Sequence, residues 1–528
     1  MSHESIRRDF LRISAVGASG SILAGARAVS ATQPPPSQLA TFNVRSFGAR
    51  GDDKTLDTPA INQAIDAAAA AGGGTVVFTG GSYLCYSVHL KSHVSLFLGP
   101  GATIVAADSP AGASSQGYDP PEPNPWDQYQ DFGHSHWHNS LIWGENISNI
   151  SITGPGRIWG KGLSRGTADD RLPPGTGNKS ISLKNCHHVT LRDFSILHGG
   201  HFAVLATGVD NLTIDNLLID TNRDGVDIDC CKNVRVSNCS VNSPWDDAIC
   251  PKSSFALGYA RSTDNVTITN CYVTGGYEEG TLLDGTFKPI APDHPTPRNG
   301  RIKLGTESNG GFRNITVANC ALENCRGIAL ETVDGGLLED VAISNIAMRD
   351  VVDVPFFLRL GRRMRGPEGA PIGQLRRVLI SNVVVSNADS RQASIISGVP
   401  DHSIENVRFA NIYIQHRGGG AKEAAAVLVP EIENAYPEPN RFGPIPAQGF
   451  FIRHVRGIEM RNIETSAIEQ DFRPDFVLED VEGADFVHVK HRNSAGPAFV
   501  LRNVKDFELI QSRPAPDTYV DTVAEKTI

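Results

Sequence analysis

Short segments in which apolar and polar residues alternate recur along most of the chain. Four clear copies read NLTIDNLLI from Asn211, NVRVSNC from Asn233, NVTITNC from Asn265 and NITVANC from Asn314. Such alternation is typical of a β-strand with one buried and one exposed face. Copies recur roughly every 22 to 32 residues, with some longer gaps, which indicates stacked units that cannot bury their apolar faces alone.

The repeat therefore predicts an all-β fold, a parallel β-helix in which each coil contributes several short strands. Equivalent strands of successive coils would pair into long parallel sheets, with rungs about 4.8 Å apart. The asparagine that recurs beside each strand suits a turn in which its side chain bonds the local backbone. We expect successive asparagines to stack along the axis.

The segment from residue 41 to 85 has a different pattern. It opens with a strand and a turn, and Ile61, Ile65 and Ala68 then recur at helical spacing between about Thr58 and Ala71. The glycines at 72–74 end this helix. We predict an N-terminal capping helix that covers the open end of the stack, because a terminal coil exposes unpaired strand edges.

The first residues resemble an export signal. Arg7 and Arg8 precede a short, weakly apolar stretch and a small-residue site that ends at Ala31, a pattern typical of twin-arginine (Tat) signal peptides. We expect a periplasmic or secreted protein, exported by this route and without a membrane anchor. The predicted organisation is a signal at 1–31, a Pro-rich linker at 32–40 and a single parallel β-helix domain at 41–528.

Composition narrows the choice of partners. The formal net charge is −10 at pH 7, which argues against nucleic acid or an anionic membrane surface. Four of the nine cysteines end the repeated contexts KNC, SNC, TNC and ANC, a structural rhythm rather than metal-ligand spacing. We expect no metal site, no cofactor and a monomer.

Two neighbouring strands of the repeat carry a cluster of five aspartates: Asp224, Asp227 and Asp229 in NRDGVDID, and Asp246 and Asp247 in SPWDDAIC. Asp224 and Asp247 are 23 residues apart, about one coil, so their side chains should lie on adjacent rungs, roughly 5 to 9 Å apart. Like charges this close shift each other's pKa, and hydrolysis of a glycosidic bond needs two carboxyl groups. Asp229 and Asp193 fit turns better, and Asp227 suits either role.

The segment NRDGVDID…PWDDAIC resembles the NTDG…DD core of glycoside hydrolase family 28, the polygalacturonase-like family. Residues 46–78 resemble the opening segment of that family, and the likeness extends over essentially the whole chain after the signal. The resemblance implies a right-handed parallel β-helix that hydrolyses a pectic polysaccharide or oligosaccharide with inversion. It assigns Asp246 as the general acid, and Asp224 and Asp247 as the residues that position and activate water.

Two motifs of the family are altered in this chain. Gly300 stands where the family has a histidine, and the family's RIK aligns with ALE, so that Ala329 replaces the arginine and Glu331 replaces the lysine. Glu331 would repel a substrate carboxylate, which favours a neutral sugar on the leaving side and a rhamnogalacturonan-like substrate over plain homogalacturonan. The literal RIK at 301–303 is interpreted as a chance match, although Lys303 could supply a displaced cation.

Further residues are candidates for substrate binding. His201 lies one coil before Asp224, and Lys252 follows the aspartate pair. A basic cluster and three large aromatic residues could extend a groove or stack on sugar rings, but solvated or packing roles are equally open to them: Arg359, Arg362, Arg363, Trp143, Trp159 and Trp245. The insertions 120–139 and 277–299 are candidate walls of the groove.

Two other functions stay open. A polysaccharide lyase would need Ca²⁺ held by carboxylates and a basic residue that abstracts a proton. A non-catalytic carbohydrate-binding β-helix would keep the fold without cleaving a bond.

Overall fold

The computed structural model describes residues 40–110, 117–131, 133–166, 172–291, 294–389 and 391–528. Residues 40–528 form one compact unit. The expected signal peptide and nearly all of the expected linker lie outside the described residues. Within the described ranges, no helix combines the length and apolar character that a membrane span requires.

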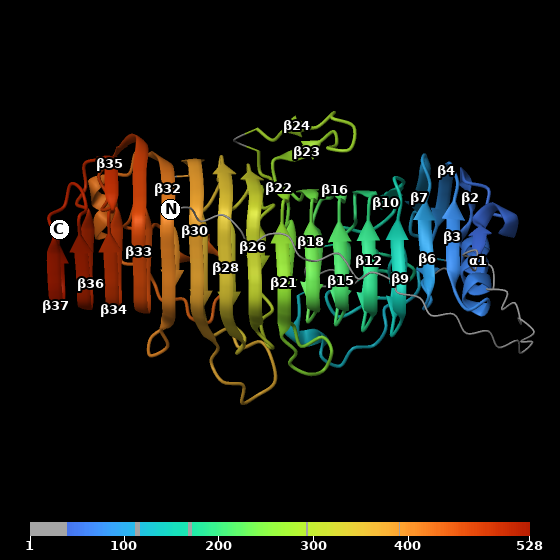
Figure 1. Cartoon of the computed structure of the whole chain (residues 1–528), viewed down its shortest axis with the longest axis horizontal. Coiled ribbons are helices and arrows are strands. Elements are labelled where there is room, and N and C mark those ends of the chain that lie inside the picture. The colour runs from blue at the N-terminus through green and yellow to red at the C-terminus, as the bar shows by residue number, and fades with distance from the viewer. Residues whose placement is uncertain (1–39, 111–116, 132, 167–171, 292–293, 390) are drawn as a thin grey trace, which may run out of the picture. The chain divides into compact units, whose positions relative to one another are not determined.

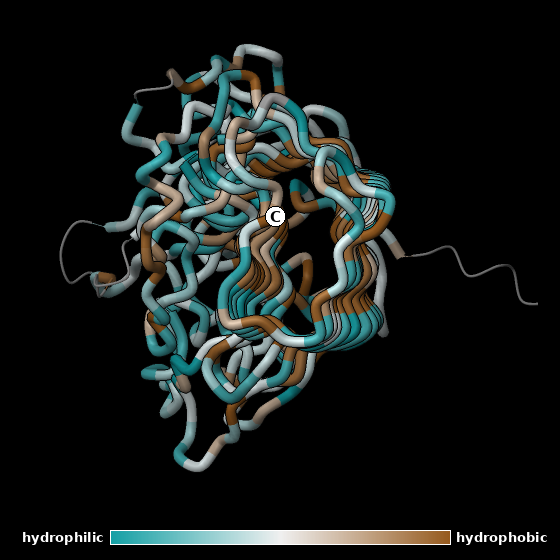
Figure 2. The backbone as a smooth tube through the Cα atoms, turned by 90° about the vertical axis from the view of Figure 1, so that its left-hand side faces the viewer, coloured by the Kyte–Doolittle hydropathy of each residue, from teal (hydrophilic) through white to brown (hydrophobic). Residues whose placement is uncertain are grey.

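Strands stack in a right-handed parallel β-helix, as predicted. Thirty-five strands of the described chain belong to one sheet, and the hairpin β23 (Tyr277–Glu279) and β24 (Lys288–Pro289) stands apart. Successive coils superpose when viewed along the axis, and the longer connecting segments lie mainly to one side (Figure 2). The pairings define three columns of strands, called A, B and C below.

Column A is the wall that faces the viewer in Figure 1. It consists of β1 (Thr41–Asn43), β3 (Gly74–Phe78), β6 (Val94–Leu98), β9 (Ser148–Thr153), β12 (His187–Arg192), β15 (Asp210–Asp215), β18 (Lys232–Ser237), β21 (Thr263–Thr269), β26 (Phe312–Glu323), β28 (Leu337–Arg349), β30 (Gln374–Ala388), β32 (Ile404–Gly418), β33 (Phe450–Asp471), β34 (Phe476–Val487), β36 (Phe499–Ile510) and β37 (Thr518–Thr527). The last strand, β37, runs antiparallel to β36.

Columns B and C complete each coil. Column B consists of β2 (Asp52–Leu56), β4 (Gly81–Cys85), β7 (Ala102–Ala106), β10 (Arg157–Trp159), β13 (Ser195–Leu197), β16 (Leu218–Asp220), β19 (Ser240–Asn242), β22 (Tyr272–Thr274), the later parts of the long strands, and β35 (Lys490–Ser494). Column C consists of β5 (Val88–His89), β8 (Ile142–Glu145), β11 (Lys179–Lys184), β14 (Phe202–Thr207), β17 (Asp224–Asp229), β20 (Ile249–Lys252), β25 (Ile302–Leu304), β27 (Ile328–Thr332), β29 (Phe356–Leu360), β31 (Ser394–Ser397) and the start of β33.

The apolar side chains of each strand stack on their counterparts one coil further on. In column A, Leu212 is in register with Val234, Val234 with Val266, and Val266 with Ile315, and all four are buried. Each such side chain contributes about 1.5 to 3 kcal/mol when it is fully buried. Stacking therefore supplies the core that no single coil could form.

Asparagines stack beside column A, as the sequence predicts. Asn211, Asn233, Asn265 and Asn314 all have positive φ between 54° and 59°. The side-chain amide of each donates to the side-chain oxygen of the one before it, over 3.2, 3.0 and 2.7 Å in chain order. A second ladder joins Asn319, Asn345, Asn382, Asn411 and Asn462.

Helices are few among the described residues. The helix α1 (Thr58–Ala70) lies at the N-terminal end of the stack and buries Ile61, Ala64, Ile65 and Ala68 (Figure 1). That it shields the strand edges of the first coil remains a prediction. The short 3₁₀ helices are η1 (Val44–Phe47), η2 (Asp127–Tyr129), η3 (Lys422–Ala426) and η4 (Pro439–Phe442).

All nine cysteines lie among the described residues. Each is buried and each is a free thiol. Of the cysteines in the repeated contexts, Cys239 and Cys271 follow strands of column A, Cys186 follows β11 of column C, and Cys320 lies within β26. All four belong to the apolar core. They therefore act as small core residues.

Candidate active site

Column C differs from column A because both of its faces are buried. Every residue of β14, β17, β20, β27 and β29 is buried, whereas β15 in column A alternates between buried and solvent-contacting residues. The outer face of column C is covered by connecting segments. Charged residues on this face are thus held in a desolvated environment.

Asp224 and Asp247 lie on neighbouring rungs of column C, as predicted. Val226 is in register with Ile249, and the amide of Gly225 donates to the carbonyl of Asp247 over 2.9 Å. Carboxylate oxygens of Asp224, Asp246 and Asp247 all lie within 4.8 Å of one another. This is closer than the expected 5 to 9 Å, because the two rungs are in direct register and the expectation allowed for a lateral offset.

Asp247 is held by two cations. Its Oδ1 accepts from Arg301 Nε over 2.8 Å, and its Oδ2 lies 2.5 Å from Lys303 Nζ. Burial alone would raise the pKa of Asp247, but Lys303 and Arg301 hold it well below its usual range. Two side chains of the literal RIK thus contact the acid cluster, where Lys303 was a candidate for a displaced cation, but both bind a protein carboxylate.

Asp224 is in the opposite electrostatic situation. Burial and the nearby carboxylates of Asp227 and Asp246 raise the pKa of Asp224 well above its usual range. Its Oδ1 is buried and has no hydrogen-bond partner within the described part of the chain. A carboxyl group in this setting favours its neutral form.

Asp246 is the member of the acid cluster that reaches solvent. Its side chain is 23% exposed, and its Oδ2 accepts from Arg223 Nη2 over 2.8 Å. The adjacent Trp245 is exposed, and its indole donates to Glu278 Oε1, in the β23–β24 hairpin, over 2.9 Å. The insertion 277–299 thus borders the acids, where the sequence analysis placed a groove wall.

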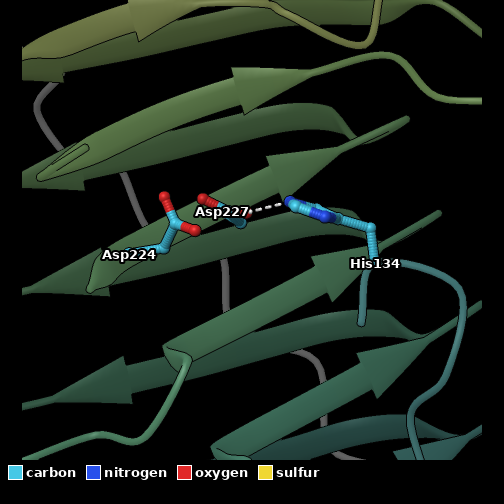
Figure 3. A group of neighbouring side chains, drawn as sticks. All are labelled: His134, Asp224 and Asp227. Carbon is cyan, nitrogen blue, oxygen red and sulfur yellow. Dashed lines mark hydrogen bonds and ion pairs between the residues drawn. The ribbon is translucent and has the colours of Figure 1, made fainter. Parts of the chain in front are cut away.

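A histidine from the other predicted wall also reaches the cluster. His134 Nε2 lies 3.2 Å from Asp227 Oδ2, and Asp224 lies beside this pair (Figure 3). Burial alone would lower the pKa of His134, but Glu307 and Asp227 raise it above its ordinary value. Sequence reasoning missed His134, although the run GHSHWHN at 133–139 within the insertion is a signal that could have identified it.

Lys252 is buried between two carboxylates. Its Nζ lies 3.8 Å from Asp227 Oδ2 and 3.5 Å from Glu307 Oε2. Burial opposes its charge, but these acids raise its pKa well above the usual value. Lys252 therefore neutralises protein carboxylates next to the acid cluster.

The remaining aspartates have structural partners. Asp229 accepts from the amide and the hydroxyl of Ser254 over 2.8 and 2.6 Å. Asp193 has positive φ and accepts from the side chain of Asn216 over 2.9 Å. The positive φ of Asp193 fits the turn that the sequence favours, whereas Asp229 is the last residue of strand β17 and not part of a turn.

Glu331 lies on the outer face of column C but is fully buried. Burial raises its pKa to about 7, while Lys303 and Arg301 oppose this shift. A fully buried carboxyl does not meet a sugar directly. The expected direct repulsion of a substrate carboxylate by Glu331 is therefore not supported by its position.

His201 is also buried. Its ring packs against Phe202, with ring centroids 4.5 Å apart. Burial, and then the charge of Arg223, lower the pKa of His201 well below its ordinary value, so the ring is neutral. It lies one coil before Asp224, as expected.

The predicted basic cluster does not line an open groove. Arg359 is buried and donates to Ser397 Oγ and to the carbonyls of Gly398 and Glu431. Arg363 binds Asp334, and Arg362 binds Glu433. Among the aromatic candidates, Trp143 donates to Asp119 and stacks on His138, and Lys161 lies over Trp159.

A segment that the sequence analysis did not single out, 427–447, covers column C on the C-terminal side of the acids. Phe442 and Ile445 pack against Phe357 and Phe451 of the outer face. Glu438 accepts from Arg301 over 2.8 Å and from Arg326 over 2.6 Å, so the segment is tied to the cation that also holds Asp247.

On the N-terminal side of the acids, the insertion 120–139 covers the same face. Trp137 packs against Phe202, Leu205 and Ala256. Asp131, from the same insertion, pairs with Arg365, which also binds Glu307. Together with the hairpin, these segments enclose the acid cluster.

Two groups of side chains have the spacing of a cation site: His134 with Asp224 and Asp227, and Asp224 with Asp246 and Asp247, each with donor atoms within 4.8 Å of one another. Four protein cations already bind carboxylates of these groups: Arg223, Lys252, Arg301 and Lys303. Positive charge at the cluster is therefore supplied by side chains.

Comparison with known families supports the fold, and one matched range spans the acid cluster. The model of Glycosyl hydrolases family 28 matches residues 128–278, which contain His134 and all three clustered aspartates. The model described as Rhamnogalacturonase A/epimerase, pectate lyase-like, matches residues 41–153.

Individual relatives agree with these matches. A probable polygalacturonase of Vitis vinifera is 25% identical over 324 residues, which are 57% of this chain and 60% of that protein. An exopolygalacturonase of Thermotoga maritima superposes with a TM-score of 0.58 at 17% identity, over 81% of this chain and 91% of that chain. A family 28 exopolygalacturonase of Yersinia enterocolitica gives 0.57 at 18% identity, over 90% and 80%.

The chain thus shares the parallel β-helix fold of these solved structures and carries adjacent carboxyl groups on one wall. More narrowly, residues 128–278 match the model of glycosyl hydrolase family 28, over less than half of the chain.

Proposed function

We propose that the protein hydrolyses glycosidic bonds in a galacturonate-containing pectic polysaccharide or oligosaccharide, with inversion of configuration. One observation carries the proposal of hydrolysis: Asp224, Asp246 and Asp247 meet on consecutive coils, with oxygens within 4.8 Å, and Asp246 reaches solvent. Inversion rests on the resemblance to family 28 and not on this distance. The family 28 match over residues 128–278 and the similarity to a probable polygalacturonase support a pectic substrate.

The roles follow from the surroundings of each acid. Asp246 donates a proton to the leaving glycosidic oxygen as the bond to the anomeric carbon breaks. Water attacks that carbon from the opposite face, and its proton passes to Asp247, which Arg301 and Lys303 keep ionised. Asp224, with its buried unpaired oxygen, holds the water in place.

We further propose a rhamnogalacturonan-like substrate over plain homogalacturonan. The family's cations are absent at Ala329 and Glu331. The match of residues 41–153 to a rhamnogalacturonase-type model points the same way. Because Glu331 is buried, its contribution would be the lack of a substrate-binding cation rather than direct repulsion.

Defined pectic oligosaccharides test the proposal. We expect the wild-type protein to cleave rhamnogalacturonan fragments faster than oligogalacturonates, and NMR of the first product to show the inverted anomer. Asp246→Asn should lower kcat by about 10²- to 10⁴-fold, because a general acid is lost. The control Asp193→Asn, at an Asn-ladder position, should retain activity.

Other products would identify the alternatives. An unsaturated, ultraviolet-absorbing product whose formation stops with chelator would identify a lyase. Binding that survives in Asp246→Asn, with no cleavage by the wild type, would identify a binding protein. Efficient depolymerisation of polygalacturonate alone would contradict the rhamnogalacturonan preference.

A further inference from the structure

Three neighbouring side chains form the solvent-facing entrance to the acid cluster, called the mouth below: Arg223, Trp245 and Asp246. The side chains of Arg223 and Asp246 are 26% and 23% exposed, and Trp245 is 40% exposed. Asp224 and Asp247 lie behind them and are buried. A substrate that approaches the acids therefore meets a cation, an aromatic ring and a carboxylate first.

Arg223 differs from the other cations of the cluster. Lys252, Arg301 and Lys303 are buried and bound to protein carboxylates. Of the four cations that bind the clustered aspartates and Asp227, Arg223 is the one with solvent access. It is thus the cation of this cluster that a substrate carboxylate can reach.

The hydrogen bonds of Arg223 are incomplete. Nη2 donates to Asp246 and Nη1 donates to the carbonyl of Gly166 over 3.1 Å. Nε is buried and has no hydrogen-bond partner in the described chain. A buried donor without an acceptor is unfavourable, and a turn of the Arg223 side chain that presents Nε and Nη2 to one substrate carboxylate would satisfy both.

We propose that Arg223 is a uronate-binding residue that exchanges partners during the reaction. The carboxylate of a galacturonate residue beside the scissile bond takes Nε and Nη2, so Asp246 Oδ2 is released. The freed Asp246 takes a proton from solvent and passes it to the glycosidic oxygen as that bond breaks, while Arg223 keeps its charge. This inference rests on the proposed function and adds the residue that recognises the acidic sugar.

Trp245 completes the site. Its exposed ring offers an apolar face for a sugar ring, and the hydrogen bond to Glu278 fixes the orientation of the indole. In a polysaccharide that alternates galacturonate with a neutral sugar, Arg223 would bind the galacturonate at the cleaved bond. The neutral sugar would need no cation. A free carboxylate next to the bond would then be required for full activity.

A matched pair of substrates tests the inference, one rhamnogalacturonan oligosaccharide with free galacturonate carboxylates and the same one methyl-esterified. In Arg223→Gln the ratio of kcat/KM for acid over ester should fall about 10- to 100-fold, the value of one charge-assisted hydrogen bond. Arg223→Lys should recover part of this ratio. Arg192→Gln, which removes an exposed arginine of column A, should leave it unchanged.

Calorimetric binding of both oligosaccharides gives a readout that needs no turnover. Wild-type protein should bind the acid more tightly than the ester, and Arg223→Gln should bind the two alike. An unchanged ratio in Arg223→Gln, with both rates lowered in proportion, would overturn the inference. If the wild type cleaves neither substrate, the proposed function fails, and equal wild-type binding of acid and ester would then overturn this inference separately.

Discussion

Asp224 and Asp247 are identical residues one coil apart, and their neighbours favour opposite protonation states. Two cations contact Asp247, whereas Asp224 faces the carboxylates of Asp227 and Asp246. The chemistry of each acid thus comes from its contacts. Asp247 therefore stays ionised, as its proposed base role requires, whereas Asp224 favours its neutral form.

Glu331 gives a prediction about pH and stability. Its pKa rises from 4.5 to about 7 on burial, so the unfolded chain releases this proton at a lower pH than the folded protein does. The free energy of unfolding should therefore fall as the pH rises from about 4.5 to about 7, by roughly 3 kcal/mol from this residue. Glu331→Gln should lack that fall in urea titrations across the range.

A second buried carboxyl serves as the control for this experiment. Asp475 lies far from the acids in sequence, and burial also raises its pKa to about 7. Asp475→Asn should therefore lose the part of the pH-dependent fall in stability that comes from Asp475, as Glu331→Gln loses the part from Glu331. If wild type and Glu331→Gln lose stability in parallel between these pH values, the buried neutral state of Glu331 is wrong.

The aspartates of the site could be predicted because their separation equals one coil of the repeat. His134 and Glu438 could not be placed, because each reaches the acids from a segment whose path has no repeating pattern. The pairing of Arg223 with Asp246 was also missed, since the sequence gives no side-chain orientation.

At the scale of elements, the asparagine ladders join one coil to the next. Each rung residue adopts the left-handed backbone region, which asparagine tolerates better than most residues, and its amide bonds the rung before it. A single asparagine thus tolerates the left-handed backbone of the turn and also forms the hydrogen bond to the previous coil. This explains why asparagine recurs at one position of the repeat.

Replacing Asn265 separates these two contributions. Asn265→Ala should lower the free energy of unfolding by about 1 to 2 kcal/mol for the backbone alone, because φ is 57° there. Asn265→Gly removes the same hydrogen bonds but accepts this φ, so its loss in urea titrations should be smaller. Equal losses in the two variants would show that the backbone conformation does not matter at this position.

The strands of columns A and B could be predicted from alternation. Column C near the acids could not be described in that way, because insertions bury its outer face and remove the polar half of the pattern. The repeat determines the core of the β-helix, whereas the segments that cover the site follow no repeating pattern.

On the scale of the whole β-helix unit, the acids lie in an enclosure rather than in a groove that runs past them. Segment 427–447 covers one side, insertion 120–139 the other, and the hairpin borders the mouth. We expect these coverings to obstruct a long polymer that lies along the axis. A chain end or a short oligosaccharide fits better.

We therefore expect attack at chain ends. With a pectic polymer, reducing ends should accumulate while viscosity falls slowly, and one small product should dominate from the earliest time points. An enzyme that cuts at internal bonds provides the comparison at equal numbers of cleaved bonds. A rapid loss of viscosity with mixed product lengths would contradict this expectation.

The nine thiols of the core have a practical consequence. None is oxidised and none is accessible in the folded coils, so a maleimide added to the native protein should find nothing to alkylate. A coil that opens would expose its cysteines to the maleimide. The order in which the cysteines are labelled in mild denaturant would therefore give the order in which the coils unfold.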